Sequence, residues 1–166
     1  AYTHLKTGFT VRANAFYNYS DNDYKVFVPI IDLATNKKID ERWVKRFNDA
    51  YRSGGIRLET GITNKPYADY LLGGIILSKN DKDVQTGATM DDVYGGVKMK
   101  SESVIPSIRY KKDDLFLDGL SLSLYGTYNS VNTFNVDTIA RRYNWLGESV
   151  QSTSAGEGYY TDSKIK

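Results

Sequence analysis

Residues that could carry catalysis are sparse in this chain of 166 residues. It contains no Cys and a single His, His4, so thiol chemistry, zinc thiolate sites and multi-histidine metal sites lack their ligands. Phosphate-binding glycine loops and the Gly-x-Ser-x-Gly element of serine hydrolases are also missing from the sequence. We therefore expect no catalytic residues, no enzymatic activity and no bound cofactor.

One acidic run has oxygen donors at alternate positions, beginning with Asp81 and Asp83 and followed by Asp92. This spacing resembles a calcium loop, but Thr86 stands where an EF-hand requires Gly, and Asp92 is shorter than the closing Glu. A solvated acidic loop is the simpler interpretation. A weak divalent-cation site at Asp81 and Asp83 is the alternative.

The long links between the expected strands contain the aromatic residues Trp43, Tyr94, Tyr143 and Trp145, of which Trp43, Tyr94 and Trp145 are considered further. Aromatic rings in loops either stack on sugars and other ligands or pack the loops together. The three residues are therefore candidate ligand-binding residues, with loop packing as the alternative role.

Composition excludes two function classes. The chain has 22 Lys and Arg against 20 Asp and Glu, a net charge of +2, and so lacks the basic footprint of a nucleic-acid-binding protein. The longest apolar stretch, Leu71 to Leu77, is far shorter than the roughly 18 residues of a membrane-spanning helix. A membrane β-barrel stays open, because its alternating strands average out as polar.

The elements that position these residues show period-two alternation, which is typical of strands with one apolar and one polar face. The clearest segments are 9–20, 56–63 and 120–129; the segment 104–111 alternates less clearly, and 71–78 and 24–31 are apolar or β-branched. The sequence thus predicts about five or six antiparallel strands.

A single helix is expected over residues 40–52. Asp40 can cap its N-terminus, and Trp43, Phe47 and Tyr51 recur every four residues. Gly54 and Gly55 would then end it.

The links between strands alternate in length. Residues 64–69 and 112–119 are short links, whereas 32–55, 79–103 and 130–166 are long. In an antiparallel meander, alternate links emerge at the same edge, so one edge is trimmed and the other heavily looped. Outer-membrane barrels have this asymmetry, with short periplasmic turns and long extracellular loops. A soluble secreted β-sandwich that binds glycan or protein is the alternative. Because the smallest outer-membrane barrels have about eight strands, the chain would either form part of a larger barrel or need partners to close one.

The order and spacing of several segments resemble TonB-dependent outer-membrane receptors of the Bacteroidetes type. The segments are Phe16-Tyr-Asn-Tyr-Ser-Asp-Asn-Asp-Tyr-Lys-Val26, 44–53, Asn64-Lys-Pro-Tyr-Ala-Asp-Tyr-Leu-Leu-Gly-Gly-Ile-Ile-Leu-Ser78, 80–87, 93–95, Ile105-Pro-Ser-Ile-Arg-Tyr-Lys-Lys112 and 143–148. The resemblance covers most of the chain, from about residue 9 to residue 148.

The resemblance implies an all-β fold: an up-and-down meander that is a partial segment of a 22-stranded outer-membrane β-barrel, with one short helix in a long loop. Residues 1–166 would be one partial barrel segment, and the plug domain and the remaining strands would be absent. The implied function is nutrient import across the outer membrane of a Gram-negative cell, energised through TonB.

The resemblance also implies the partners. These are outer-membrane lipid, TonB acting through the missing plug region, a surface lipoprotein, and an imported small molecule, glycan or peptide; nucleic acid is not among them. On this interpretation residues 64–69 and 112–119 are periplasmic turns, whereas the helix at 40–52 and the loop at 79–103 are extracellular.

Overall fold

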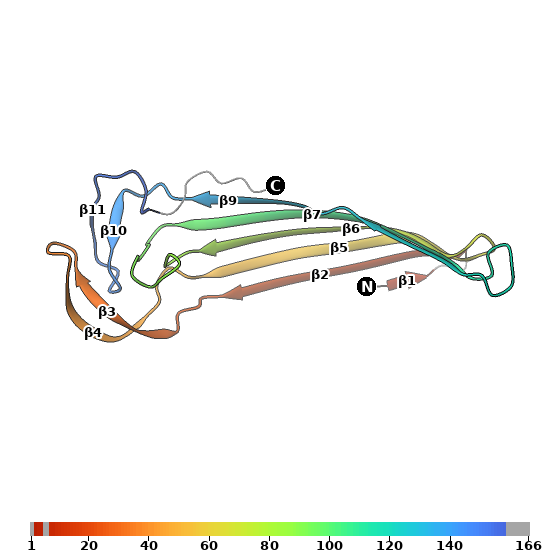
Figure 1. Ribbon diagram of the computed structural model, residues 1–166. Coiled ribbons are helices and arrows are strands. Elements are labelled where there is room, and N and C mark those ends of the chain that lie inside the picture. The colour runs from red at the N-terminus through yellow and green to blue at the C-terminus, as the bar shows by residue number, and fades with distance from the viewer. Residues whose placement is uncertain (1, 5–6, 159–166) are drawn as a thin grey trace. The chain divides into compact units, whose positions relative to one another are not determined.

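The structure, a computed structural model, describes residues 2–4 and 7–158, and Figure 1 shows that these residues form β-strands joined by turns and loops. None of the described residues is helical, so none belongs to a helix that could cross a membrane. The expected all-β, antiparallel fold is confirmed. The strands are β1 (Tyr2–His4), β2 (Phe9–Ser20), β3 (Lys25–Asp32), β4 (Lys37–Lys45), β5 (Tyr51–Lys65), β6 (Ala68–Asp83), β7 (Lys98–Lys112), β8 (Leu122–Thr127), β9 (Ser130–Val136), β10 (Arg141–Tyr143) and β11 (Ser149–Gln151).

Seven strands form one sheet in the order β1-β2-β5-β6-β7-β8, and β9 also pairs with β7. Two further sheets are two-stranded antiparallel hairpins, β3–β4 and β10–β11. The strand order has two ends, so the described residues do not close a barrel. Contacts divide the chain into two compact units: unit 1 comprises residues 1–17, 54–79 and 102–131, and unit 2 comprises 18–53, 80–101 and 132–166.

Unit 1 is a sheet whose two faces differ in polarity. Arg12 on β2 and Arg109 on β7 both contact Glu59 on β5, which places these three side chains on one face. The alternate positions on the other face are mostly apolar. In unit 1, the buried hydrophobic residues among those described are Ala68 and Leu72 alone, so neither face carries an extensive core.

Pro106 explains why β8 and β9 are separate strands along β7. Its carbonyl oxygen accepts hydrogen bonds from the Tyr128 N–H at 3.1 Å and from the Thr127 hydroxyl at 3.2 Å. In an antiparallel strand the N–H and C=O of one residue point toward the same neighbouring strand. Proline has no N–H, so Pro106 cannot donate a hydrogen bond to this neighbouring strand. Pairing with β7 therefore breaks at residues 128–129.

Unit 2 contains both hairpins and the loop of residues 84–97, and it has its own apolar core. One buried cluster consists of Val26, Val28, Ile30, Val93 and Trp145, with Val44 and Tyr143 packed against it. A second consists of Val84, Tyr94 and Val97, with Met99 packed against it. The hairpins of unit 2 are thus stabilised by burial of their own side chains.

The helix expected over residues 40–52 is wrong, because residues 37–45 form β4 and β5 begins at Tyr51. A recurrence of four residues fits a helical period of 3.6, but it is also a multiple of two, so it suits a strand equally well. Trp43 pairs with Phe27 across the hairpin. Gly55 lies within β5, where a Cβ atom would come 2.6 Å from the Phe16 ring.

The link expected over residues 79–103 is shorter in the structure than predicted. Strand β6 continues to Asp83 and β7 begins at Lys98, so residues 84–97 form the link. The short link between β5 and β6 is confirmed as a turn at Pro66 and Tyr67. The stretch from residue 130 onward, expected to be one long link, contains β9, β10 and β11. Its last residues, 159–166, lie outside the described residues.

Candidate functional site

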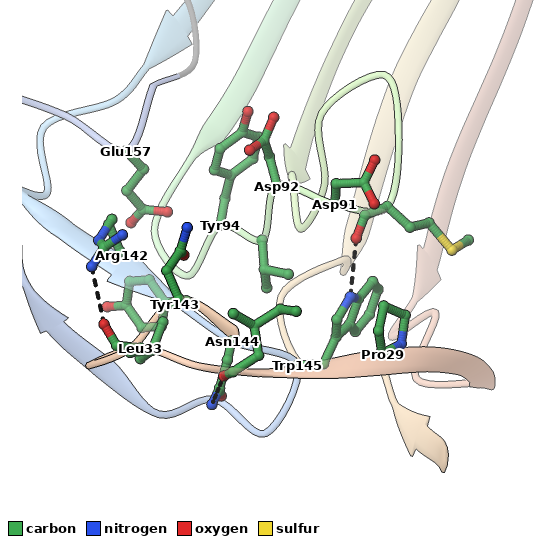
Figure 2. A pocket seen from close by; sticks show the side chains of 14 residues that line it. Pro29, Leu33, Asp91, Asp92, Tyr94, Arg142, Tyr143, Asn144, Trp145 and Glu157 are labelled. Atoms are coloured by element: carbon green, nitrogen blue, oxygen red, sulfur yellow. Dashed lines mark hydrogen bonds between the residues drawn. The ribbon is translucent and has the colours of Figure 1, made fainter. Parts of the chain in front are cut away.

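The candidate site is a pocket within unit 2, shown in Figure 2, with a cavity of about 230 Å³. Its walls come from the β3–β4 hairpin, the loop of residues 84–97, and the β10–β11 hairpin. The lining residues are Pro29, Ile31, Leu33, Asn36, Met90, Asp91, Asp92, Val93, Tyr94, Arg142, Tyr143, Asn144, Trp145 and Glu157.

The first wall is fixed by the turn that joins β3 to β4. The Asp32 carboxylate accepts hydrogen bonds from the Thr35 hydroxyl at 2.5 Å and from the Ala34 N–H at 3.2 Å. These bonds hold the pKa of Asp32 below its ordinary value, with the Thr35 hydroxyl as the larger cause. Asn36 completes the turn with a φ of 56°, a left-handed conformation that Asn tolerates.

The second wall is fixed by Asn144, which is buried in the turn between β10 and β11. Its side-chain oxygen accepts hydrogen bonds from the Leu146 N–H at 3.0 Å and the Glu148 N–H at 3.2 Å. Its amide group donates to Glu148 at 2.7 Å and to the Ile31 carbonyl at 3.2 Å. Asn144 therefore joins the two hairpins, because Ile31 belongs to β3.

Trp145 lines the pocket and anchors the core beneath it. The side chain is 3% exposed and packs with Val28 and Val93. Its indole N–H donates to the Met90 carbonyl at 3.1 Å, a bond drawn in Figure 2. The ring thus serves mainly as packing, which is the alternative role considered for this residue.

Tyr94 also lines the pocket and is buried against Val84 and Val97. Its backbone N–H donates to the Gln85 carbonyl at 2.7 Å, and its own carbonyl accepts from Asn48 at 3.2 Å. The structure therefore brings Tyr94 and Trp145 to one pocket.

Trp43 is not among the pocket-lining residues. It lies on β4, is 65% exposed, and packs against Phe27 with ring centroids 5.7 Å apart and ring planes tilted by 56°. This pair forms an exposed aromatic surface on the β3–β4 hairpin.

The candidate cation ligands Asp81 and Asp83 lie on strand β6 and not in a loop. Lys100 lies 3.9 Å from Asp81 and Lys98 lies 3.5 Å from Asp83. Within the described part of the chain, no three acidic, His or Cys side chains gather closely enough to hold a metal ion. The two residues therefore form partly buried ion pairs with lysines of β7.

The sequence pattern missed Glu157, which lies in the pocket beside Arg142 and Tyr143 in Figure 2. Its carboxylate accepts a hydrogen bond from the Gly95 N–H at 2.6 Å. Burial is the main cause that raises the pKa of Glu157; the Gly95 N–H opposes the rise and the Asp137 carboxylate adds to it. No local motif marked this residue, since its environment is assembled from distant segments.

Chemically, the pocket offers hydrogen-bonding groups next to aromatic walls. Asp91, Asp92 and Glu157 supply acceptors, and Arg142 supplies donors, one of which bonds to the Leu33 carbonyl at 3.1 Å. Such a lining suits a polar ligand group that both donates and accepts hydrogen bonds.

A scan against protein-family models finds no match, and neither a search of the curated proteins nor a search of the solved structures finds one.

Proposed function

We propose that this chain forms part of the barrel wall and external loops of an outer-membrane importer of the TonB-dependent type. The observation that carries the proposal is the uncovered apolar face of unit 1. The large hydrophobic side chains of this face that are more than a third exposed are Phe9, Val11, Tyr17, Ile56, Leu58, Leu77, Val104, Ile108, Leu122, Leu124 and Tyr128. An apolar surface that runs across β2, β5, β6, β7 and β8 calls for an apolar surrounding phase.

The length of this apolar surface fits a bilayer. Every second residue of β6 lies on the apolar face, and on this face no charged residue occurs between Asp69 and Lys79. On the same face of β7, no charged residue occurs between Glu102 and Lys112. Ten residues of strand span about 33 Å. A tilt of about 40° reduces that span to roughly 25 Å, the height of the apolar band of outer-membrane barrels.

Strand length and link length support the same proposal. Strands β5, β6 and β7 have 15, 16 and 15 residues, longer than the 3–10 residues usual in globular proteins. The β5–β6 turn contains two residues, whereas the β6–β7 link contains residues 84–97. Outer-membrane barrels alternate short turns with long loops in this way.

The opposite face of unit 1 has the polarity expected for the interior of such a barrel. It carries Arg12, Glu59 and Arg109 together with small side chains such as Ser103 and Ser107. Since the described strands leave the sheet open, further strands would complete the wall. The partners would be outer-membrane lipid, TonB through a plug region, and a surface lipoprotein.

In this proposal unit 2 supplies extracellular loops, and its pocket contacts the imported small molecule, glycan or peptide. The alternative, a soluble secreted β-sandwich, requires a second sheet packed over the apolar face of unit 1. The exposure of Leu58, Ile108 and Leu124 weighs against that alternative.

The dependence of folding on an apolar phase tests this proposal. The full chain is refolded in buffer and in detergent micelles, and its strand content and unfolding are followed by circular dichroism. We expect a cooperative, strand-rich state of unit 1 only with micelles. A monodisperse monomer that unfolds cooperatively without detergent would contradict the barrel-wall function.

A further inference from the structure

The polar face of unit 1 holds a carboxylate surrounded by arginines. Glu59 is 5% exposed, and its two oxygens lie 2.5 Å from Arg109 and 3.2 Å from Arg12. Arg57 approaches the same carboxylate at 3.6 Å. Three strands, β2, β5 and β7, therefore bring three guanidinium groups to one acidic side chain.

In this cluster three guanidinium groups face a single carboxylate. Among the ion pairs of the described residues, Arg12, Arg57 and Arg109 all share Glu59. Asp69 is a further carboxylate nearby, and it is paired with Lys112 at 3.3 Å. One guanidinium would neutralise Glu59, and each additional one repels its neighbours in a partly desolvated setting.

A cavity of about 460 Å³ lies against two of these arginines. It is lined by Arg12, Thr63, Asn64, Asp69, Tyr70, Leu72 and Arg109. Arg109 also stacks on Tyr70, with its guanidinium carbon 6.0 Å from the ring centroid. The guanidinium groups at the cavity wall are therefore held in place before any ligand arrives.

We propose that this cavity binds a small oxyanion, a phosphate, sulfate or carboxylate group, between Arg12 and Arg109. Planar guanidinium groups pair with such groups through two parallel hydrogen bonds. Glu59 positions both arginines and partly offsets their charge, so the bound anion is held reversibly. The inference goes beyond barrel-wall function, since it requires only the polar face of unit 1.

The test measures binding of inorganic phosphate, sulfate and acetate to the folded full chain by calorimetry, with chloride at equal ionic strength as the comparison. We expect saturable binding of the oxyanions and none of chloride. Arg12→Gln and Arg109→Gln should each weaken binding about tenfold, the effect of one lost charge-assisted pair. Arg52→Gln, in unit 2, is the matched control and should leave binding unchanged.

Glu59→Gln provides the opposite change. Removing the competing negative charge should tighten oxyanion binding by roughly tenfold and make it more sensitive to salt. The strand content of each variant is checked by circular dichroism. Arg109→Gln could unfold the chain, because it removes one of the positive charges that compensate the buried Glu59 carboxylate. Arg12 is half-exposed, so Arg12→Gln is the second variant that keeps the test valid.

Binding that equals that of chloride, or that survives both arginine substitutions in folded protein, would overturn the inference. Either result leaves the barrel-wall function standing, because lipid dependence is measured separately. Conversely, oxyanion binding by a chain that folds without detergent would retain this site and reject the barrel wall.

Discussion

Leu58 in unit 1 and Val28 in unit 2 are both aliphatic residues of antiparallel strands, yet Leu58 is 45% exposed and Val28 is 1% exposed. Unit 2 buries the apolar side chains of its hairpins against each other and against Trp145. Unit 1 leaves its apolar face uncovered. The comparison shows internal packing in unit 2 and none over the apolar face of unit 1, which is the arrangement that the proposed barrel-wall function requires.

The largest loss of stability is expected from a substitution in the core of unit 2. Trp145→Ala should lower the free energy of unfolding of this unit by about 3–5 kcal/mol, because the buried indole leaves a cavity. Trp43→Ala, on the exposed face of the β3–β4 hairpin, should cost less than about 1 kcal/mol. Denaturant unfolding, followed by fluorescence of the remaining tryptophan, measures both. Equal losses would show that burial does not distinguish the two residues.

The next largest effect is expected from a charge placed on the apolar face of unit 1, compared with the same charge on the polar face. Ile108→Arg places a charge on the apolar face and should destabilise the chain in a lipid bilayer by about 2–4 kcal/mol. Ser107→Arg, the adjacent residue on the polar face, should cost less than about 1 kcal/mol. Folding equilibria in lipid vesicles give the two values. Similar costs at both positions would mean that lipid does not contact the apolar face.

A backbone contact should distinguish two glycines of the β5–β6 pair. A Cβ atom at Gly61 would lie 2.0 Å from the Leu71 carbonyl oxygen, whereas at Gly73 the nearest atom is 4.0 Å away. Gly61→Val should therefore cost about 1–3 kcal/mol, and Gly73→Val should be neutral or stabilising. Thermal unfolding in micelles compares the two variants. A tolerated valine at position 61 would be incompatible with this strand pairing.

The smallest effect concerns the pocket of unit 2. The pKa of Glu157 is raised from 4.5 in the folded protein, mainly by burial, so the folded state binds a proton more tightly than the unfolded state. The stability of unit 2 should decrease as the pH rises from about 4.5 through the raised pKa, and remain level above it. Glu157→Gln should remove this dependence, and the exposed Glu41→Gln should preserve it. Unfolding measured across this pH range provides the test; the same slope in both variants would exclude Glu157 as its source.

Much of the fold could be predicted from alternation, because period two is a local property that strands express directly. The segments 9–20 and 56–63 lie within β2 and β5. The β4 strand could not be predicted in this way. Both of its faces are largely exposed, so it shows little alternation, and the spacing of Trp43 and Phe47 suited a helix equally well.

The candidate site was predictable only in part. Tyr94 and Trp145 were candidates from their residue type and their place between expected strands, and both line the pocket. Glu157 and Asn144 were missed, because their roles depend on contacts with segments distant in sequence, such as Gly95 and Ile31.

Environment-sensitive labelling along β7 tests the central claim most directly. The chain has no Cys, so single cysteines at Val104 and Ile108, and at Ser103 and Ser107, can each carry one fluorophore in lipid vesicles. We predict that a lipid-soluble quencher acts on labels at Val104 and Ile108 but not on labels at Ser103 and Ser107. Equal quenching at all four positions, or protection of Val104 and Ile108 from water without lipid, would contradict a lipid-facing apolar surface.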